Sequence, residues 1–360
     1  MFRIPSFLLL FVALATFAAA CGDDDDTSVG QGGDLPTVVV TTNILGDVVT
    51  ELTGGAVNVV TIMPVGADPH DFQASAQQVA EMQSASVLIV NGGSFEEGLL
   101  DVIEGAEADG VAVYEALSAV STIEFGEGGH DDHGHDDHGD EEGHEGEEDH
   151  DHEGEESKDE DHDDHDHEGE EGHDDHEGHD HSGDDPHFFT DPARMALAVD
   201  GIAAFLIANV DGIDADAVSA AAEAYHDKLE ALDAEVAALV ESIPTESRVL
   251  ITNHEVFGYF ADRYGFEVAG AVIPSGSTVD SSSAGELAEL AELIQAEGVA
   301  AIFSDVSASD QLAQTLADEV GDIAVVALFT ESLGESGSDG ATYVEMVRTN
   351  AERIAGALAS

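Results

Sequence analysis

Short apolar runs alternate with longer segments of mixed apolar and polar residues along most of the chain. The runs predict strands at residues 37–41, 57–63, 87–90 and 111–114, and again at 248–252, 268–273, 299–304 and 323–329. Apolar residues spaced three or four apart predict helices at 45–52, 75–84, 95–103, 256–264, 284–296, 311–320 and 343–358. Strand–helix alternation is typical of parallel sheets with crossover helices. The pattern therefore predicts an α/β fold of two lobes, each a parallel sheet of about four strands flanked by helices.

One long helix is predicted to join the lobes. Residues 215–242 contain neither Gly nor Pro, and Ile243-Pro244 ends the pattern. The apolar positions, three or four residues apart, are Val218, Ala222, Tyr225, Leu229, Leu232 and Val236. Such a helix spans roughly 40 Å and permits rocking of the lobes rather than wide opening. The predicted organisation is an N-terminal lobe at 37–214, a linking helix at 215–243 and a C-terminal lobe at 244–360.

The N-terminus has the pattern of an export signal. Arg3 precedes an apolar run from Ile4 to Ala20, which is shorter than a membrane-spanning helix requires, and Cys21 follows three alanines. The segment resembles a lipobox, so we predict a signal peptide at 1–20, lipidation of Cys21 and an acidic tether at 21–36. An ordinary signal peptide with an incidental Cys21 is the alternative. Lipidation would hold the protein outside the cytoplasm, in the periplasm or at the outer face of the membrane.

Charge and cysteine content exclude several classes of protein. The chain has 8 Lys and Arg against 79 Asp and Glu, for a formal charge of −71. This charge argues against nucleic acid or anionic lipid headgroups as electrostatic partners and favours cations. The single Cys excludes an internal disulfide and a cysteine-based zinc site. The chain is also acidic outside residues 130–182. This acidity suggests a surface adapted to a salty medium, where ions screen the repulsion between its charges.

A histidine-rich insert occupies residues 130–182. Residues 130–181 contain 14 His and 28 Asp and Glu but no apolar residue, so we expect this segment to be disordered when unliganded. Imidazole and carboxylate groups in many spacings predict several weak, exchanging metal sites. A solvated acidic linker is the alternative, although it would not need histidine. The candidate ligands are His130, His133, His135, His138, His144, His150, His152, His162, His165, His167, His173, His176, His179 and His181.

Four histidines lie outside the insert. His70 follows the second predicted strand, His187 precedes a helix, and His254 stands where the fifth predicted strand meets its helix. Ligands of open α/β sheets collect at the carboxyl ends of strands, so these three histidines are predicted to point into one crevice between the lobes. His226 lies among polar residues of the long helix and is predicted to be a solvated surface residue. The shared loop setting of the first three favours a metal site.

Four short motifs stand in a fixed order around this crevice. They are GADPH at 66–70, DPHF at 185–188, HEVFGYF at 254–260 with YG at 264–265, and FTESLG at 329–334. Together they resemble the zinc- and manganese-specific solute-binding lipoproteins of ABC importers, the cluster A-I (ZnuA/TroA-like) family. The resemblance runs from Thr37 to the C-terminus, apart from the insert.

The resemblance implies four metal ligands in the interlobe crevice, two from each lobe. Carried over, they are His70, His187, His254 and Glu331. The family usually has Asp where this chain has Glu331, and Asp305 is a lesser candidate for the fourth ligand. Three imidazoles and one carboxylate suit tetrahedral Zn²⁺, whereas manganese members replace the third His with a carboxylate. We therefore expect a monomeric, membrane-anchored protein that captures Zn²⁺ and delivers it to an ABC importer permease.

Other functions remain as alternatives. One alternative is a carrier of manganese or another divalent metal. Another is a zinc buffer or adhesin that acts through the insert. A zinc hydrolase is not supported, because Gly258 stands where the second His of a His-Glu-x-x-His motif would be. We therefore expect no enzymatic activity.

Overall fold

The computed structural model describes residues 35–125, 183–321 and 323–359. The predicted signal peptide, Cys21 and nearly all of the tether lie outside these residues. The histidine-rich insert at 130–182, with its fourteen histidines, also lies outside them. The predictions for these segments therefore stay predictions.

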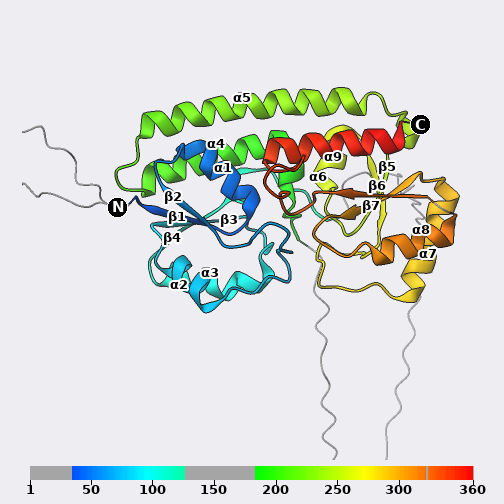
Figure 1. Ribbon diagram of the computed structural model, residues 1–360, viewed down its shortest axis with the longest axis horizontal. Coiled ribbons are helices and arrows are strands. Elements are labelled where there is room, and N and C mark those ends of the chain that lie inside the picture. Colours follow the sequence, from blue (N-terminus) through cyan, green and yellow to red (C-terminus); the bar gives the residue numbers. More distant parts are fainter. Residues whose placement is uncertain (1–34, 126–182, 322, 360) are drawn as a thin grey trace, which may run out of the picture. The chain divides into compact units, whose positions relative to one another are not determined.

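The described chain contains two parallel four-stranded sheets, which confirms the predicted fold class (Figure 1). The N-terminal sheet has the order β2-β1-β3-β4, and the C-terminal sheet has the equivalent order β6-β5-β7-β8. In the first sheet, Val38 of β1 pairs with Val59 of β2 and with Val87 of β3. The strands are β1 (Thr37–Val40), β2 (Asn58–Thr61), β3 (Val87–Val90), β4 (Ala112–Glu115), β5 (Val249–Thr252), β6 (Glu267–Ala271), β7 (Ala301–Asp305) and β8 (Ala324–Leu328).

Helices cover both faces of each sheet. Figure 1 shows α2 and α3 on one face of the first sheet and α7 and α8 on the same side of the second, with α1, α4, α5 and α9 on the opposite side. The α-helices are α1 (Asn43–Thr53), α2 (Ala76–Gln83), α3 (Leu100–Ala108), α4 (Pro192–Asn209), α5 (Ala215–Val240), α6 (Gly258–Tyr264), α7 (Ala284–Glu297), α8 (Gln311–Val320) and α9 (Tyr343–Leu358). Short 3₁₀ helices are η1 (Glu97–Leu99), η2 (Ala116–Ala119), η3 (Phe188–Thr190) and η4 (Thr245–Ser247).

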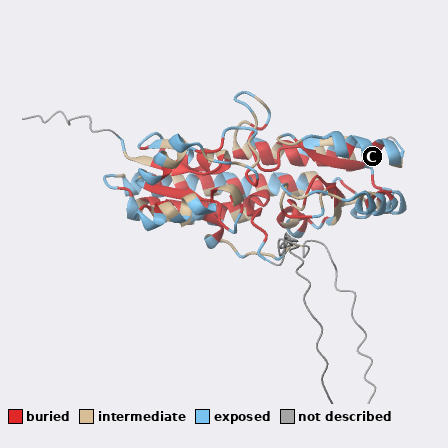
Figure 2. Ribbon diagram, turned by 90° about the horizontal axis from the view of Figure 1, so that it is seen from below, coloured by how far each residue is buried: buried red, intermediate tan, exposed pale blue. Residues whose placement is uncertain are grey.

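One hydrophobic core runs through both lobes. Val38 and Val40 of β1 belong to the same buried cluster as Leu250 of β5 and Phe303 of β7, together with the inner faces of α1, α4, α5 and α9. Val39 of β1 points the other way, into a separate cluster with α2 and α3, and a third cluster lies under α7 and α8. Figure 2 shows this burial along the strands and on the helix faces that meet them. Alternate residues of each strand therefore belong to different cores, as a period of two requires.

Helix α4 is long and apolar enough to cross a membrane by length and composition alone, the one such helix in the described ranges. It packs against α5, and Met195, Val199 and Ile202 on its inner face belong to the shared core. Its sequence is apolar on more than one face because it lies between the first sheet and α5. The structure thus uses α4 as a core helix.

The long helix α5 is fastened by ion pairs to other parts of the chain. Lys228 on α5 contacts Glu51 of α1 at 2.8 Å, and Arg348 of α9 contacts Glu235 of α5 at 2.9 Å. Arg263 of α6 donates to Asp233 of α5 at 2.9 Å. Half of the six Lys and Arg residues in the described part of the chain are therefore used to hold α5 against its neighbours.

Candidate metal centre

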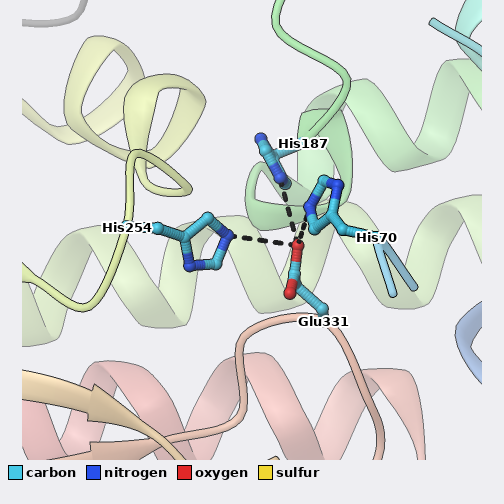
Figure 3. A group of neighbouring side chains, drawn as sticks. All are labelled: His70, His187, His254 and Glu331. Atoms are coloured by element: carbon cyan, nitrogen blue, oxygen red, sulfur yellow. Dashed lines mark hydrogen bonds and ion pairs between the residues drawn. The ribbon is translucent and has the colours of Figure 1, made fainter. Parts of the chain in front are cut away.

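Four buried side chains converge where the two lobes meet. One ligand atom from each of His70, His187, His254 and Glu331 lies within 4.8 Å of the other three (Figure 3). No other group of three or more His, Cys, Asp or Glu residues within the described ranges has such a geometry. All four residues lie in loops next to strands or helices. The sheets and helices therefore fix where these side chains point.

His70 lies in the loop that follows β2. The Asp68 carboxylate accepts a hydrogen bond from the His70 backbone N–H at 3.0 Å and so shapes the turn. The Nε2 atom of His70 lies 2.8 Å from Oε1 of Glu331, and its Nδ1 atom lies 3.0 Å from Oε1 of Glu97 in η1. The Glu97 carboxylate thus orients the ring so that Nε2 faces the other ligands.

His187 precedes η3 and is held by a similar local contact. The Asp185 carboxylate accepts a hydrogen bond from the His187 backbone N–H at 2.8 Å, and the same oxygen lies 2.7 Å from Nδ1 of the ring. Asn91 donates to the carbonyl of Pro186 at 2.9 Å and ties this loop to the end of β3. Nε2 of His187 is therefore directed toward Oε1 of Glu331, at 3.2 Å.

Phe95, a member of the shared core, packs against the two N-terminal histidine rings. Its ring centroid lies 5.2 Å from that of His70 and 5.5 Å from that of His187, with edge-on geometry in both cases. Because Phe95 is itself buried, the imidazoles have an apolar wall behind them. This wall restricts water and keeps both rings in one orientation.

His254 and Glu331 come from the C-terminal lobe. His254 follows β5, where the Thr252 hydroxyl donates to the His254 carbonyl at 2.7 Å, and its Nε2 lies 3.1 Å from Oε1 of Glu331. Nδ1 of His254 and Oε2 of Glu331 are buried and have no hydrogen-bond partner among the described residues. All three Nε2 atoms thus face one carboxylate oxygen.

The electrostatics of this group follow from burying one carboxylate among imidazoles. Burial alone would lower the pKa of His70, but the carboxylates of Glu331 and Glu97 outweigh it and raise the pKa to about 10. Burial opposes the charge of His187 as well, yet Asp185 and Glu331 raise its pKa. Burial would raise the pKa of Glu331, whereas His254 and His70 hold it well below the usual value. Without a metal, a proton on His70 helps to compensate the charge of the carboxylate.

The spacing of the four ligand atoms suits a small tetrahedral cation. Zinc–ligand bonds of about 2.0–2.1 Å imply ligand–ligand edges of about 3.3–3.4 Å in a tetrahedron. The three edges from Nε2 of each histidine to Oε1 of Glu331 are 2.8, 3.2 and 3.1 Å. A small outward movement of the carboxylate would therefore admit an ion of this size.

The structure brings together all four residues that the sequence singled out, but not Asp305. That residue ends β7, is buried, and accepts hydrogen bonds from the Ser307 backbone N–H and hydroxyl at 2.7 Å. Burial and the charge of Glu331 raise the pKa of Asp305. His226, expected to be solvated, is instead half-buried between α4 and α5, with Nδ1 at 3.3 Å from a carboxylate oxygen of Asp200.

The carboxylates that support the histidines were not predicted from the sequence. Asp185 had a detectable signal, because Asp-Pro-His occurs twice, at 68–70 and at 185–187, and each aspartate accepts from the backbone of its own histidine. Glu97 had none, because its contact with His70 joins residues that are 27 positions apart.

Comparison with known families decides what kind of protein carries this site. The sequence profile of the family described as zinc-uptake complex component A, periplasmic (ZnuA), matches residues 38–357. This chain belongs to that family. ZnuA-family proteins are metal-binding, substrate-binding components of ABC transporters. The resemblance inferred from the four motifs is thereby confirmed.

Curated relatives of this ZnuA-family chain divide between two metals. The zinc-binding protein TroA of Treponema pallidum (strain Nichols) is 27% identical over 364 residues, covering 99% of this chain and 98% of its own. The manganese-binding lipoprotein MntA of Bacillus subtilis (strain 168) is also 27% identical, covering 98% of both chains. The solved structure of TroA from Treponema pallidum superposes with a TM-score of 0.71 at 25% identity, covering 91% of this chain and 100% of that one.

Proposed function

We propose that this protein is an extracytoplasmic zinc carrier that captures Zn²⁺ and delivers it to the permease of an ABC importer. The observation that carries the proposal is the buried group of three imidazoles and one carboxylate, to which each lobe contributes two residues. Such a set encloses a dication and offsets one of its two charges, without needing a water ligand. Family membership supports the transport role.

The ligand chemistry favours zinc over manganese. Zinc is commonly held by four ligands that include histidine, whereas manganese favours oxygen ligands and a larger coordination number. His254 supplies nitrogen as the third ligand, and the four residues are almost completely buried, which leaves little room for additional water. Relatives bind either metal, so the choice for this chain rests on its own residues.

The position of the ligands suggests how the cargo is released. Because His70 and His187 belong to one lobe and His254 and Glu331 to the other, a bound ion joins the lobes. A permease that docks on both lobes would separate them and remove half of the ligands. A cavity of about 630 Å³ at the lobe boundary reaches His70 and Glu97, and the ion would enter on this side as the lobes separate.

We further propose that the histidine-rich insert gathers zinc for this site. Phe125 and Gly183, described residues that flank the insert in sequence, both line the cavity that reaches His70. Zinc held by the insert would therefore be concentrated near the entrance. Deleting 130–181 is expected to lower the total zinc bound and the capture rate at low zinc, and to leave one tight site. Loss of the tight site on deletion would contradict this division of roles.

A zinc titration with metal analysis tests the carrier function. Soluble protein that starts at Asp23 and lacks 130–181 is expected to hold one zinc tightly per chain. His187→Ala should abolish that binding because it removes a ligand, and His226→Ala, a matched control outside the site, should not. Absence of tight zinc from the parent would refute the proposal. If His187→Ala retained tight zinc, the binding site would have to lie outside the crevice.

A further inference from the structure

Hydrogen bonds outside the ligand group join the two loops that carry His70 and Glu331. Ser332, directly after Glu331, is completely buried. Its hydroxyl oxygen accepts a hydrogen bond from the Gly66 backbone N–H at 2.7 Å, and Gly66 lies four residues before His70. The two ligand loops, from opposite lobes, are therefore in direct polar contact at a point that no metal ion would touch.

Asn43 completes this contact from the first turn of α1. Its amide nitrogen donates to the Ser332 hydroxyl at 3.0 Å, and its amide oxygen accepts from the Leu333 backbone N–H at 2.7 Å. The same amide nitrogen reaches the Pro64 carbonyl at 3.3 Å, within its own lobe. One side chain thus holds the start of the His70 loop and both residues that follow Glu331.

A second bond from the C-terminal lobe reaches the His70 loop. The Thr278 hydroxyl donates to Oδ2 of Asp68 at 2.6 Å, while Oδ1 of Asp68 accepts from the His70 backbone N–H. The backbone of His70 is therefore held through Asp68 by a residue of the opposite lobe. Both contacts exist only when the lobes are together, because each joins residues more than 200 positions apart in different lobes.

We propose that Asn43 and Ser332, with the Gly66 backbone, form an interlobe clasp whose opening limits the rate at which the bound ion leaves. This inference rests on the proposed carrier function. Asn43 and Ser332 are positioning residues, since they touch ligand loops rather than the ion. The clasp keeps Glu331 opposed to His70, so an ion cannot lose the C-terminal ligands until these hydrogen bonds break. Capture is little affected, because the ion enters while the lobes are apart.

The clasp predicts a change in the release rate that is not matched by a change in capture. Full-length mature protein is loaded with one equivalent of Zn²⁺, and release to an excess of chelator is followed by stopped flow. Asn43→Ala and Ser332→Ala should each speed release by about ten- to a hundredfold, because each removes interlobe hydrogen bonds. The association rate should change by less than about threefold. Because the two side chains share one hydrogen bond and each makes a further one, the double variant should release zinc faster than either single variant, but by less than the product of the two effects.

Asn58→Ala is the matched control. Asn58 is exposed in β2, and its amide donates to Thr37 within the N-terminal lobe, so its removal should leave release unchanged. The melting temperature of the metal-free protein separates a clasp from a general loss of stability, since Asn43→Ala should lower it no more than Asn58→Ala does. Unchanged release in both clasp variants, or effects that multiply in the double variant, would overturn the clasp. Absence of tight zinc from the parent would instead overturn the carrier function itself.

Discussion

At the scale of single residues, two copies of one tripeptide are put to different uses. Asp68-Pro69-His70 and Asp185-Pro186-His187 share the hydrogen bond from the histidine backbone to the aspartate. Asp185 also contacts its own histidine ring, whereas Asp68 is bonded to Thr278 and the His70 ring contacts Glu97 instead. The opposite lobe therefore reaches the first ligand through the Asp68 carboxylate, whereas the aspartate carboxylate of the second is used on its own histidine.

Zinc binding is expected to release protons. At pH 7 the metal-free protein holds a proton on His70, because the adjoining carboxylates raise its pKa to about 10, and a metal ion must displace that proton. Zinc affinity should rise by about tenfold per pH unit for each proton displaced between pH 6.5 and 8.5. Calorimetry at pH 7 in buffers of different ionisation enthalpy should report at least one proton released. An affinity that does not depend on pH would contradict this.

The same pKa sets the sign of the effect on stability. Protonated His70 stabilises the metal-free fold fully below about pH 6.5, and this contribution is lost as the pH rises through about 10. The zinc-bound protein does not carry that proton. The difference in melting temperature between zinc-bound and metal-free protein should therefore widen as the pH rises.

The four converging residues could be predicted from sequence, but most of the residues that support them could not. His70, His187 and His254 stand in short motifs next to predicted strands and helices, and local sequence carries that information. Glu97, Asn43, Ser332 and Thr278 act through partners up to 290 positions away, which only the folded chain brings near. A polar residue in a loop has the same appearance in sequence whether or not it meets such a partner.

At the scale of elements, the first residues of helix α6 contact Asp185, whose carboxylate orients the His187 ring. Gly258, its first residue, lies so close to Asp185 that a Cβ atom there would be 2.6 Å from Oδ2 of Asp185. Tyr259, the next residue, donates through its hydroxyl to the Asp185 carbonyl at 2.6 Å. The start of α6 in one lobe therefore packs directly on the residue that orients His187 in the other.

Gly258→Ala is expected to weaken zinc binding by about ten- to a hundredfold, because the added methyl group would displace the Asp185 carboxylate from His187. Gly285→Ala is the matched control: it also lies in the first turn of a helix, and a Cβ atom there meets only the Ser283 hydroxyl, at 3.7 Å. Competition with a chelator of known affinity gives both values. Equal affinities in the two variants would show that this close approach has no role in binding.

Elements that are buried along their whole length match the sequence pattern well. All four residues of β3 are buried, and the predicted strand at 87–90 is found without change. The predicted helix at 95–103 is wrong in its bounds, because Gly92, Gly93 and Ser94 have positive φ and lead into η1 before α3. The bounds of α4 could not be predicted, because an apolar helix between a sheet and α5 has little periodicity.

At the scale of the whole molecule, the excess of acid sets the conditions for stability. Outside residues 130–181 the chain has 51 acidic and 7 basic residues, so self-repulsion opposes the compact state. We expect the melting temperature of the zinc-free protein to rise by at least several degrees between about 0.05 M and 2 M KCl, since screening shortens the range of repulsion. Thermal unfolding followed by circular dichroism measures this. A melting temperature that is equal at low and high salt would contradict a surface adapted to salt.

The core that runs through both lobes also decides whether either half of the protein could fold alone. The two halves repeat one plan of strands and helices, yet Leu250 and Phe303 of the second half are covered by the same helical layer as Val38 and Val40 of the first. A gene fragment that encoded either half alone would leave that layer without half of its contacts. The clusters under α2 and α3 and under α7 and α8 are separate from it. The two halves are therefore expected to fold only as one unit.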